Sequence, residues 1–173
     1  MDDEPWYRES TARAPATWAD GDVLPPHASA CLGCGPDNPH GLHLETRRDG
    51  DGVRARLVVD ERHQGAPGIS HGGAVAVAFD ELLGSVLFLV GEPTVTRELT
   101  VEYLRPVLLG RAYDLTGRVT RRDGRKIWTE GEATDADDGG VVARSRAFFL
   151  VVPVEHFDVG GAAGATAGLP FAP

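Results

Sequence analysis

One segment constrains the fold of this chain more than any other, an apolar run from Ala74 to Val90 that is broken only by Asp80, Glu81, Gly84 and Ser85. A helix of this length with apolar residues nearly all round must be enclosed by other elements. The adjacent carboxylates near its middle argue against a membrane span, because each costs about 2.5–3.5 kcal/mol at the centre of a bilayer. The run therefore predicts a helix buried in a globular domain, without membrane insertion.

The residues that precede this run are Ser70-His71-Gly72-Gly73. Two glycines at the start of a helix leave its first amide N–H groups unshielded by side chains. Two turns later, Asp80 places a carboxylate on the same helix. Preorganised N–H donors stabilise an oxyanion, and acyl hydrolysis needs a base or a nucleophile. This combination favours chemistry on a carbonyl group.

Size and charge exclude several classes of function. The chain has 173 residues, a net charge of −9 and a pI of about 5.0. This length is typical of one domain. The acidic balance argues against a nucleic-acid partner, which requires a basic stripe. The first residues, Met1-Asp2-Asp3-Glu4, lack the cationic and apolar pattern of a secretory signal, so we expect a cytoplasmic protein.

The pattern along the rest of the chain predicts the architecture. Residues 1–30 indicate an irregular N-terminal arm and residues 157–173 a disordered tail rich in Gly, Ala and Pro. Between them, alternation of apolar and polar residues predicts strands within 41–47, 53–60, 95–103, 113–119, 126–134 and 141–152, several joined by hairpin turns. We predict an α+β fold for residues 31–156, with one antiparallel sheet of five to six strands wrapped around one long central helix.

The two cysteines of the chain form a short motif, Cys31-Leu32-Gly33-Cys34. Two cysteines cannot supply the usual structural zinc site alone, and the spacing to His40 and His43 is tighter than in zinc fingers. A redox role would require a thioredoxin-like βαβ context, whereas this motif lies in a loop rich in Gly, Pro and Asn. The sequence favours two reduced cysteines and no metal.

Further motifs follow one another in a specific order: Cys31-Leu32-Gly33-Cys34-Gly35 with Asn38-Pro39-His40-Gly41-Leu42, His63-Gln64-Gly65 through Pro67-Gly68, His71-Gly72-Gly73 with Asp80, Tyr103-Leu104-Arg105-Pro106, and Gly124-Arg125-Lys126. With these motifs, the chain from about Cys31 to Val154 resembles the hotdog-fold acyl-CoA thioesterases of the PaaI and thioesterase-superfamily-member type.

The resemblance implies a hotdog protomer that hydrolyses acyl-CoA thioesters to free acid and CoA without a cofactor. It implies a homodimer, often paired into a homotetramer, with the site at the subunit interface. The amide of Gly72 would polarise the thioester carbonyl, and Asp80 would act as general base or nucleophile. Thr96, or Thr94 in its place, would position the attacking water. The basic pair Arg125 and Lys126 would bind coenzyme A phosphates.

The resemblance also implies supporting roles near the helix start. His71 is expected to orient the turn by hydrogen bonding, and Gly73 to contact the substrate. Phenylacetyl-type members carry an Asn before the His-Gly-Gly turn, and here either Gln64 replaces it or backbone amides do all the polarising. From their own patterns, Thr96 is expected on the polar side of its strand, and Glu81 is expected as a partly exposed or interface-paired acid.

Helix geometry supports a shared site independently of the resemblance. Gly72 and Asp80 are eight residues apart, which is about 12 Å along a helix. One carbonyl group cannot contact both within a single chain. Two antiparallel helices about a twofold axis would bring Gly72 of one subunit beside Asp80 of the other.

Three other functions stay open at this stage. The chain could be a thioesterase that acts on an acyl carrier protein, since a carrier-borne pantetheine thioester is chemically similar. It could be a non-catalytic acyl-binding hotdog module. A hydratase is disfavoured, because Asp37-Asn38-Pro39-His40 differs in spacing from the Asp-x-Asn-Pro-x-His signature of that class.

Overall fold

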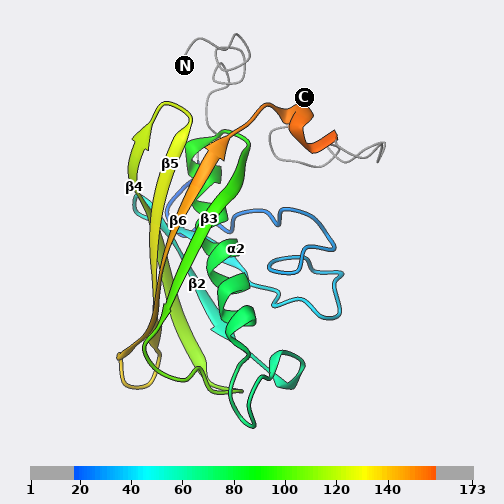
Figure 1. Ribbon diagram of the computed structural model, residues 1–173, viewed down its shortest axis with the longest axis vertical. Helices are drawn as coiled ribbons and strands as arrows, with labels where there is room; N and C mark the ends of the chain where they lie inside the picture. The colour runs from blue at the N-terminus through cyan, green and yellow to red at the C-terminus, as the bar shows by residue number, and fades with distance from the viewer. Residues whose placement is uncertain (1–17, 159–173) are drawn as a thin grey trace.

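The computed structural model describes residues 18–158, in which one long helix lies against one antiparallel sheet (Figure 1). The helix is α2 (Gly72–Val90), and the sheet has the order β1-β2-β4-β5-β6-β3. The strands are β1 (Thr46–Asp49), β2 (Gly52–Val58), β3 (Thr94–Tyr103), β4 (Ala112–Asp123), β5 (Lys126–Asp135) and β6 (Val141–Val151). This arrangement confirms the predicted α+β hotdog fold with six strands.

The segments outside the sheet and helix differ in part from the expectation. A short 3-10 helix, η1 (Glu61–His63), precedes α2, and a second, η2 (Val154–Asp158), follows β6. The tail predicted to begin at residue 157 therefore starts inside η2, and its remainder lies outside the described residues. Residues 1–17 of the expected arm also lie outside them. Residues 18–30 form turns, with Val23 bridged to Arg47 and Leu24 buried in the core.

The ends of α2 follow from its flanking residues. His71 is the N-cap, and its ring accepts a hydrogen bond from the amide of Gly73. At the other end, Gly91 adopts the left-handed conformation, with φ of 77°, and its N–H donates to the carbonyl of Leu87. Only glycine takes this conformation without steric cost, so Gly91 ends the helix.

The sheet covers α2 closely because two paired glycines lie beneath the helix. Gly117 of β4 is opposite Gly131 of β5 in the ladder. A Cβ atom at Gly117 would lie 3.1 Å from the Leu83 side chain, and one at Gly131 would lie 3.2 Å from it. The absence of side chains at these two positions lets Leu82 and Leu83 of the helix reach the sheet.

A β-bulge in β3 changes which face of the sheet the side chains at the start of this strand lie on. The pairing of β3 with β6 shifts between Thr96 and Glu98, so that Arg97 is the extra residue. Thr96 is paired with the buried Phe149, whereas Glu98 is paired with Phe148 on the opposite face. Thr96 therefore lies on the helix side of the sheet, and the prediction that it lies on the polar side is wrong. Simple alternation failed because it assumes a strand without a bulge.

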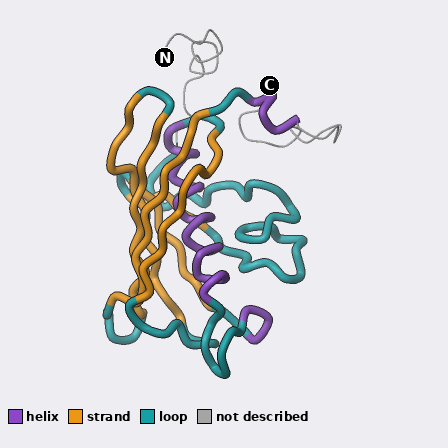
Figure 2. The backbone as a smooth tube through the Cα atoms, viewed as in Figure 1, coloured by secondary structure: helices purple, strands orange, loops and turns teal. Residues whose placement is uncertain are grey.

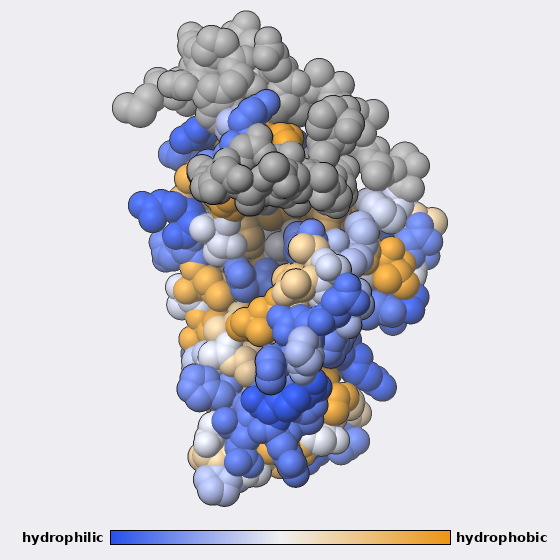
Figure 3. All heavy atoms as spheres, turned by 90° about the vertical axis from the view of Figure 1, so that its right-hand side faces the viewer, coloured by the Kyte–Doolittle hydropathy of each residue, from blue (hydrophilic) through white to orange (hydrophobic). Residues whose placement is uncertain are grey.

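The helix α2 is long and apolar enough to span a membrane, but most of it is buried in the domain. The backbone trace shows α2 with strands on one side and loops on the other (Figure 2). On the loop side of the protein, apolar and hydrophilic residues are interspersed over the described part of the surface (Figure 3). The burial of α2 between strands and loops is that of the core helix of a globular domain.

The buried face of α2 gives a direct test of this packing. Leu82 is 0% exposed, so Leu82→Ala should lower the free energy of unfolding by about 2–5 kcal/mol through lost burial and the cavity it leaves. Val58→Ala is the control, because Val58 is 51% exposed. Urea denaturation should show a change well under 1 kcal/mol for that variant. Equal effects of both substitutions would contradict the packing described.

Candidate active site

The carboxylate of Asp80 lies on a strip of α2 that the sheet leaves uncovered. Most of the helix is buried, but Gly73, Ala76, Val77 and Asp80 are half-buried or exposed and share one face at helical spacing. The hydroxyl of Thr96 on β3 donates a hydrogen bond of 2.9 Å to Asp80 Oδ1. The bulge in β3 makes this contact, because it turns Thr96 toward the helix. The structure thus brings together two predicted site residues that are 16 positions apart.

The start of α2 presents one unengaged amide among the described residues. The Gly73 N–H donates to His71 Nδ1 at 2.9 Å, and the Ala74 N–H donates to the His71 carbonyl at 2.9 Å. The Gly72 N–H has no acceptor within residues 18–158. A first-turn amide carries partial positive charge from the helix dipole. The geometry therefore singles out Gly72, rather than Gly73, as the donor available to an anionic oxygen.

Two residues fix the position of this helix start. The hydroxyl of Tyr103, the last residue of β3, donates to the Gly72 carbonyl at 2.8 Å. The amide N–H of His71 donates to the carbonyl of His63 in η1 at 2.7 Å. Tyr103 belongs to a motif that the sequence analysis used only for the resemblance. Its contact with Gly72 spans 31 positions, so no local pattern could reveal it.

Gln64 lies in the loop that leads into α2. Its side-chain oxygen accepts a hydrogen bond of 3.1 Å from the amide of Gly68, and its backbone is bridged to Ser70. Gly68 has a φ of 74°, so the loop makes a tight turn that glycine permits. Within the protomer, the Gln64 side-chain oxygen thus closes this turn.

The basic pair at the β4–β5 hairpin lies far from the helix start. Arg125 and Lys126 are at the tip of the hairpin, which is at the opposite end of the protomer from Gly72 (Figure 1). Both side chains are exposed. Near them, Arg122 is paired with the buried Glu92, and Arg121 stacks over the Trp128 ring at 4.5 Å. The protomer alone does not bring this pair to Gly72.

A second cluster of polar side chains surrounds Glu81, the residue that follows Asp80 in α2. His27 Nδ1 is 2.7 Å from Glu81 Oε1, and Cys31 Sγ donates to Glu81 Oε2 at 3.3 Å. Cys34 Sγ is 3.7 Å from His27 Nδ1. Both cysteines are free thiols. Glu81 is 7% exposed and paired within its own chain, so the expectation of a partly exposed or interface-paired acid is wrong.

The charges of this cluster act on one another. Burial alone would lower the pKa of His27, but its hydrogen bonds with the two cysteines and Glu81 raise it to about 12. Burial tends to raise the pKa of Glu81, and the contact with His27 outweighs it and lowers that pKa. The hydrogen bond with His27 lowers the pKa of Cys31, whereas burial raises that of Cys34. His40 and His43, the partners weighed from the sequence, are not part of the cluster.

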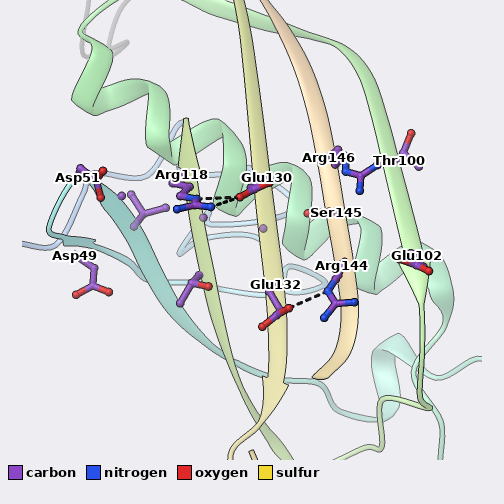
Figure 4. Close-up of a pocket in the computed structure, with 15 residues that line it drawn as sticks. Asp49, Asp51, Thr100, Glu102, Arg118, Glu130, Glu132, Arg144, Ser145 and Arg146 are labelled. Atoms are coloured by element: carbon purple, nitrogen blue, oxygen red, sulfur yellow. Dashed lines mark hydrogen bonds and ion pairs between the residues drawn. The ribbon is translucent and has the colours of Figure 1, made fainter. Parts of the chain in front are cut away.

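A wide groove crosses the face of the sheet that points away from α2 (Figure 4). Its lining includes charged cross-strand pairs, with Arg118 2.5 Å from Glu130 and Arg144 2.9 Å from Glu132. The sheet separates this groove from Asp80. An apolar acyl chain gains little from such a lining, so we assign the candidate site to the helix side.

The chain is similar to known proteins of one superfamily. A family model described as "Thioesterase superfamily" matches residues 67–142, which include α2, β3, β4 and β5. A solved structure described as protein RHA08564, a thioesterase superfamily protein, is 31% identical with a TM-score of 0.66, over 70% of this chain and 60% of that one. In residues 67–142 and in its fold, the chain is thus similar to proteins of the thioesterase superfamily.

Several curated relatives of the chain are acyl-coenzyme A thioesterases. Acyl-coenzyme A thioesterase THEM4 of Xenopus laevis is 30% identical over 87 residues, which are 50% of this chain and 39% of that protein. The chain thus spans about two-fifths of that relative. A hypothetical thioesterase from Streptococcus pneumoniae TIGR4, solved with coenzyme A, shares the fold at 20% identity with a TM-score of 0.56, over 59% of this chain and 82% of that one.

The contact between β3 and the helix start can be tested by one substitution. Tyr103→Phe removes the hydroxyl that donates to Gly72 and keeps the ring. Loss of one hydrogen bond costs about 0.5–1.5 kcal/mol, so amide hydrogen exchange at Ala74 and Val75 should accelerate about 2- to 10-fold.

The control is Thr120→Val, which removes a hydroxyl that donates to a backbone carbonyl, that of Trp128, in the β4–β5 hairpin. This variant should leave exchange at the start of α2 unchanged. Unchanged exchange in Tyr103→Phe would show that Tyr103 does not hold the helix start.

Proposed function

We propose that this protein hydrolyses acyl-CoA thioesters to a free acid and CoA. Two features of α2 carry the proposal. Its uncovered carboxylate, that of Asp80, accepts a hydrogen bond from Thr96 of β3. Its first amide, that of Gly72, has no acceptor in the described protomer. A thioester carbonyl becomes an oxyanion when it is attacked, and a preorganised N–H donor stabilises that charge. The acyl-CoA thioesterases among its relatives support this substrate class.

The proposed mechanism gives each residue one task. Asp80 accepts a proton from a water molecule, or attacks the carbonyl carbon itself and forms a mixed anhydride that water then hydrolyses. Thr96 donates to Asp80 Oδ1 and so fixes the orientation of the carboxylate. Gly72 donates to the carbonyl oxygen, and His71 keeps the helix start in place through its cap on Gly73. The thiolate of CoA leaves.

We further propose that the site is completed by a second copy of the chain. Gly72 and Asp80 lie on one rigid helix, about 12 Å apart along its axis, so one carbonyl cannot contact both in one protomer. The uncovered strip of α2 lies beside β3, which is an edge strand of ten residues in the protomer. Such an edge is a ready template for pairing. A twofold dimer through β3 would bring the two helices together in antiparallel orientation.

We propose that the same dimer brings the basic pair of the β4–β5 hairpin to the coenzyme A phosphates. In an antiparallel pair of protomers, Arg125 and Lys126 of one copy approach the end of the molecule where the partner's α2 begins. The phosphates of coenzyme A would then meet two cations in a chain of net charge −9. A dimer of dimers and a location in the cytoplasm, whose reducing conditions suit two free thiols, are part of the proposal.

Replacing the carboxylate tests the proposed chemistry. Asp80→Asn keeps the shape of the side chain but removes the base, so kcat for an acyl-CoA should fall about 10²–10⁴-fold with KM little changed. The release of CoA is followed with a thiol reagent across several acyl lengths.

The matched control is Asp49→Asn, since Asp49 is an exposed acid on β1, on the far edge of the sheet from β3. It should retain full activity. Equal turnover by the Asp80→Asn variant and the wild-type protein would remove Asp80 from the mechanism.

A further inference from the structure

The cluster of His27, Cys31, Cys34 and Glu81 has no part in the thioester chemistry described above. One ligand-capable atom from each of these four side chains lies within 4.8 Å of the others. Three of the residues come from the loop that precedes β1, and Glu81 comes from the middle of α2. A carboxylate, an imidazole and two thiols that converge on one point are the donor types that zinc binds in proteins.

We propose that these four residues form a structural zinc site. Two ligand atoms bound about 2.0–2.3 Å from one tetrahedral zinc ion lie about 3.3–3.8 Å from each other. The distance from Cys34 Sγ to His27 Nδ1 is 3.7 Å, and that from Cys31 Sγ to Glu81 Oε2 is 3.3 Å. The 2.7 Å contact of His27 with Glu81 would widen by about half an ångström as both atoms turn to the ion.

The backbone around the cysteines has the features of a zinc-binding turn. The backbone N–H of His27 donates a hydrogen bond to Cys34 Sγ at 3.1 Å. Such N–H donors orient thiolate ligands and offset their charge. A Cβ atom at Gly33 would overlap the Glu81 carboxylate, and one at Gly35 would overlap the backbone of Cys31. Glycine at both positions therefore lets the loop close around the four ligand atoms.

A metal explains the composition of the cluster better than a redox pair does. Reactive thiols in Cys-x-x-Cys motifs lie in electropositive surroundings that favour the thiolate. Here the buried carboxylate of Glu81, 7% exposed, contacts the Cys31 thiol directly, so a Cys31 thiolate and this carboxylate would share one cation, His27. A zinc ion between them would add two positive charges, which offset two of the three negative charges of the carboxylate and the two thiolates.

The site would tie a distant part of the chain to the helix that carries Asp80. His27 is 54 positions from Glu81 and Cys31 is 50 positions from it, so the ion would close a long loop. The His27 ring also stacks on Phe88 of α2, with ring centroids 5.0 Å apart. The zinc would thereby fasten the 27–34 loop over α2 next to the active-site residue.

The full-length protein, purified without added metal, is the first test. Elemental analysis should give about one zinc ion per chain, either as purified or after addition of one equivalent of Zn²⁺ and gel filtration. Cobalt in its place should produce thiolate-to-metal charge-transfer absorption. A protein that retains no zinc under either condition, or that carries a Cys31–Cys34 disulfide in place of free thiols when kept under reductant, would overturn the proposal.

Variants then locate the ion. Cys34→Ser and Glu81→Gln should each weaken zinc binding by more than about 100-fold, because loss of outer partners alone costs about 10–100-fold. The control is His40→Ala, since His40 is an exposed histidine outside the cluster. It should bind zinc as the wild type does. A strong chelator should lower the Tm of the wild type and of the control and leave the Tm of Cys34→Ser unchanged. An equal change of Tm in all three proteins would contradict the assignment.

Discussion

The fold depends on how the apolar surface of α2 is covered. The helix is buried by the sheet along most of its length, with Phe79, Leu82 and Val86 fully enclosed. The six strands of the protomer cover only part of its circumference, and one strip remains beside the edge strand β3. Asp80 lies on that strip. Because the sheet covers only part of α2, the helix is a core element and still leaves one carboxylate accessible. The surface around this carboxylate is suited to a second copy of the chain.

Two local features of the backbone, a β-bulge and a helix cap, position the groups of the candidate site. The bulge at Arg97 turns Thr96 toward the helix, where it binds Asp80. The His71 cap engages the amide of Gly73 and leaves that of Gly72 without an acceptor in the described protomer. Each feature determines where one donor or acceptor points, which is what carbonyl chemistry requires.

Much of this architecture is predictable from the sequence, because it follows from local periodicity. The run from Ala74 to Val90 predicts a buried helix, and the alternation around Gly50 and Gly124 predicts two hairpins, all of which the structure contains. The side of Thr96 was predicted wrongly, since a one-residue bulge reverses alternation without a clear signal. The His27–Glu81 pair was missed because its partners are far apart in the chain and each looks ordinary alone. The roles of Arg125 and Lys126 depend on a second protomer and stay predictions.

The central claim, that Gly72 of one subunit and Asp80 of the other act on one carbonyl, is tested most directly with mixed dimers. Gly72→Pro removes the amide N–H at the first helical position, where proline fits and where His71, with φ of −63° and ψ of 135°, already has a suitable conformation. Separately tagged Gly72→Pro and Asp80→Asn chains, each inactive alone, are coexpressed and purified as heterodimers. Such a dimer holds one intact site, so it should recover about half of the wild-type turnover. Heterodimers as inactive as their parents would contradict the shared site.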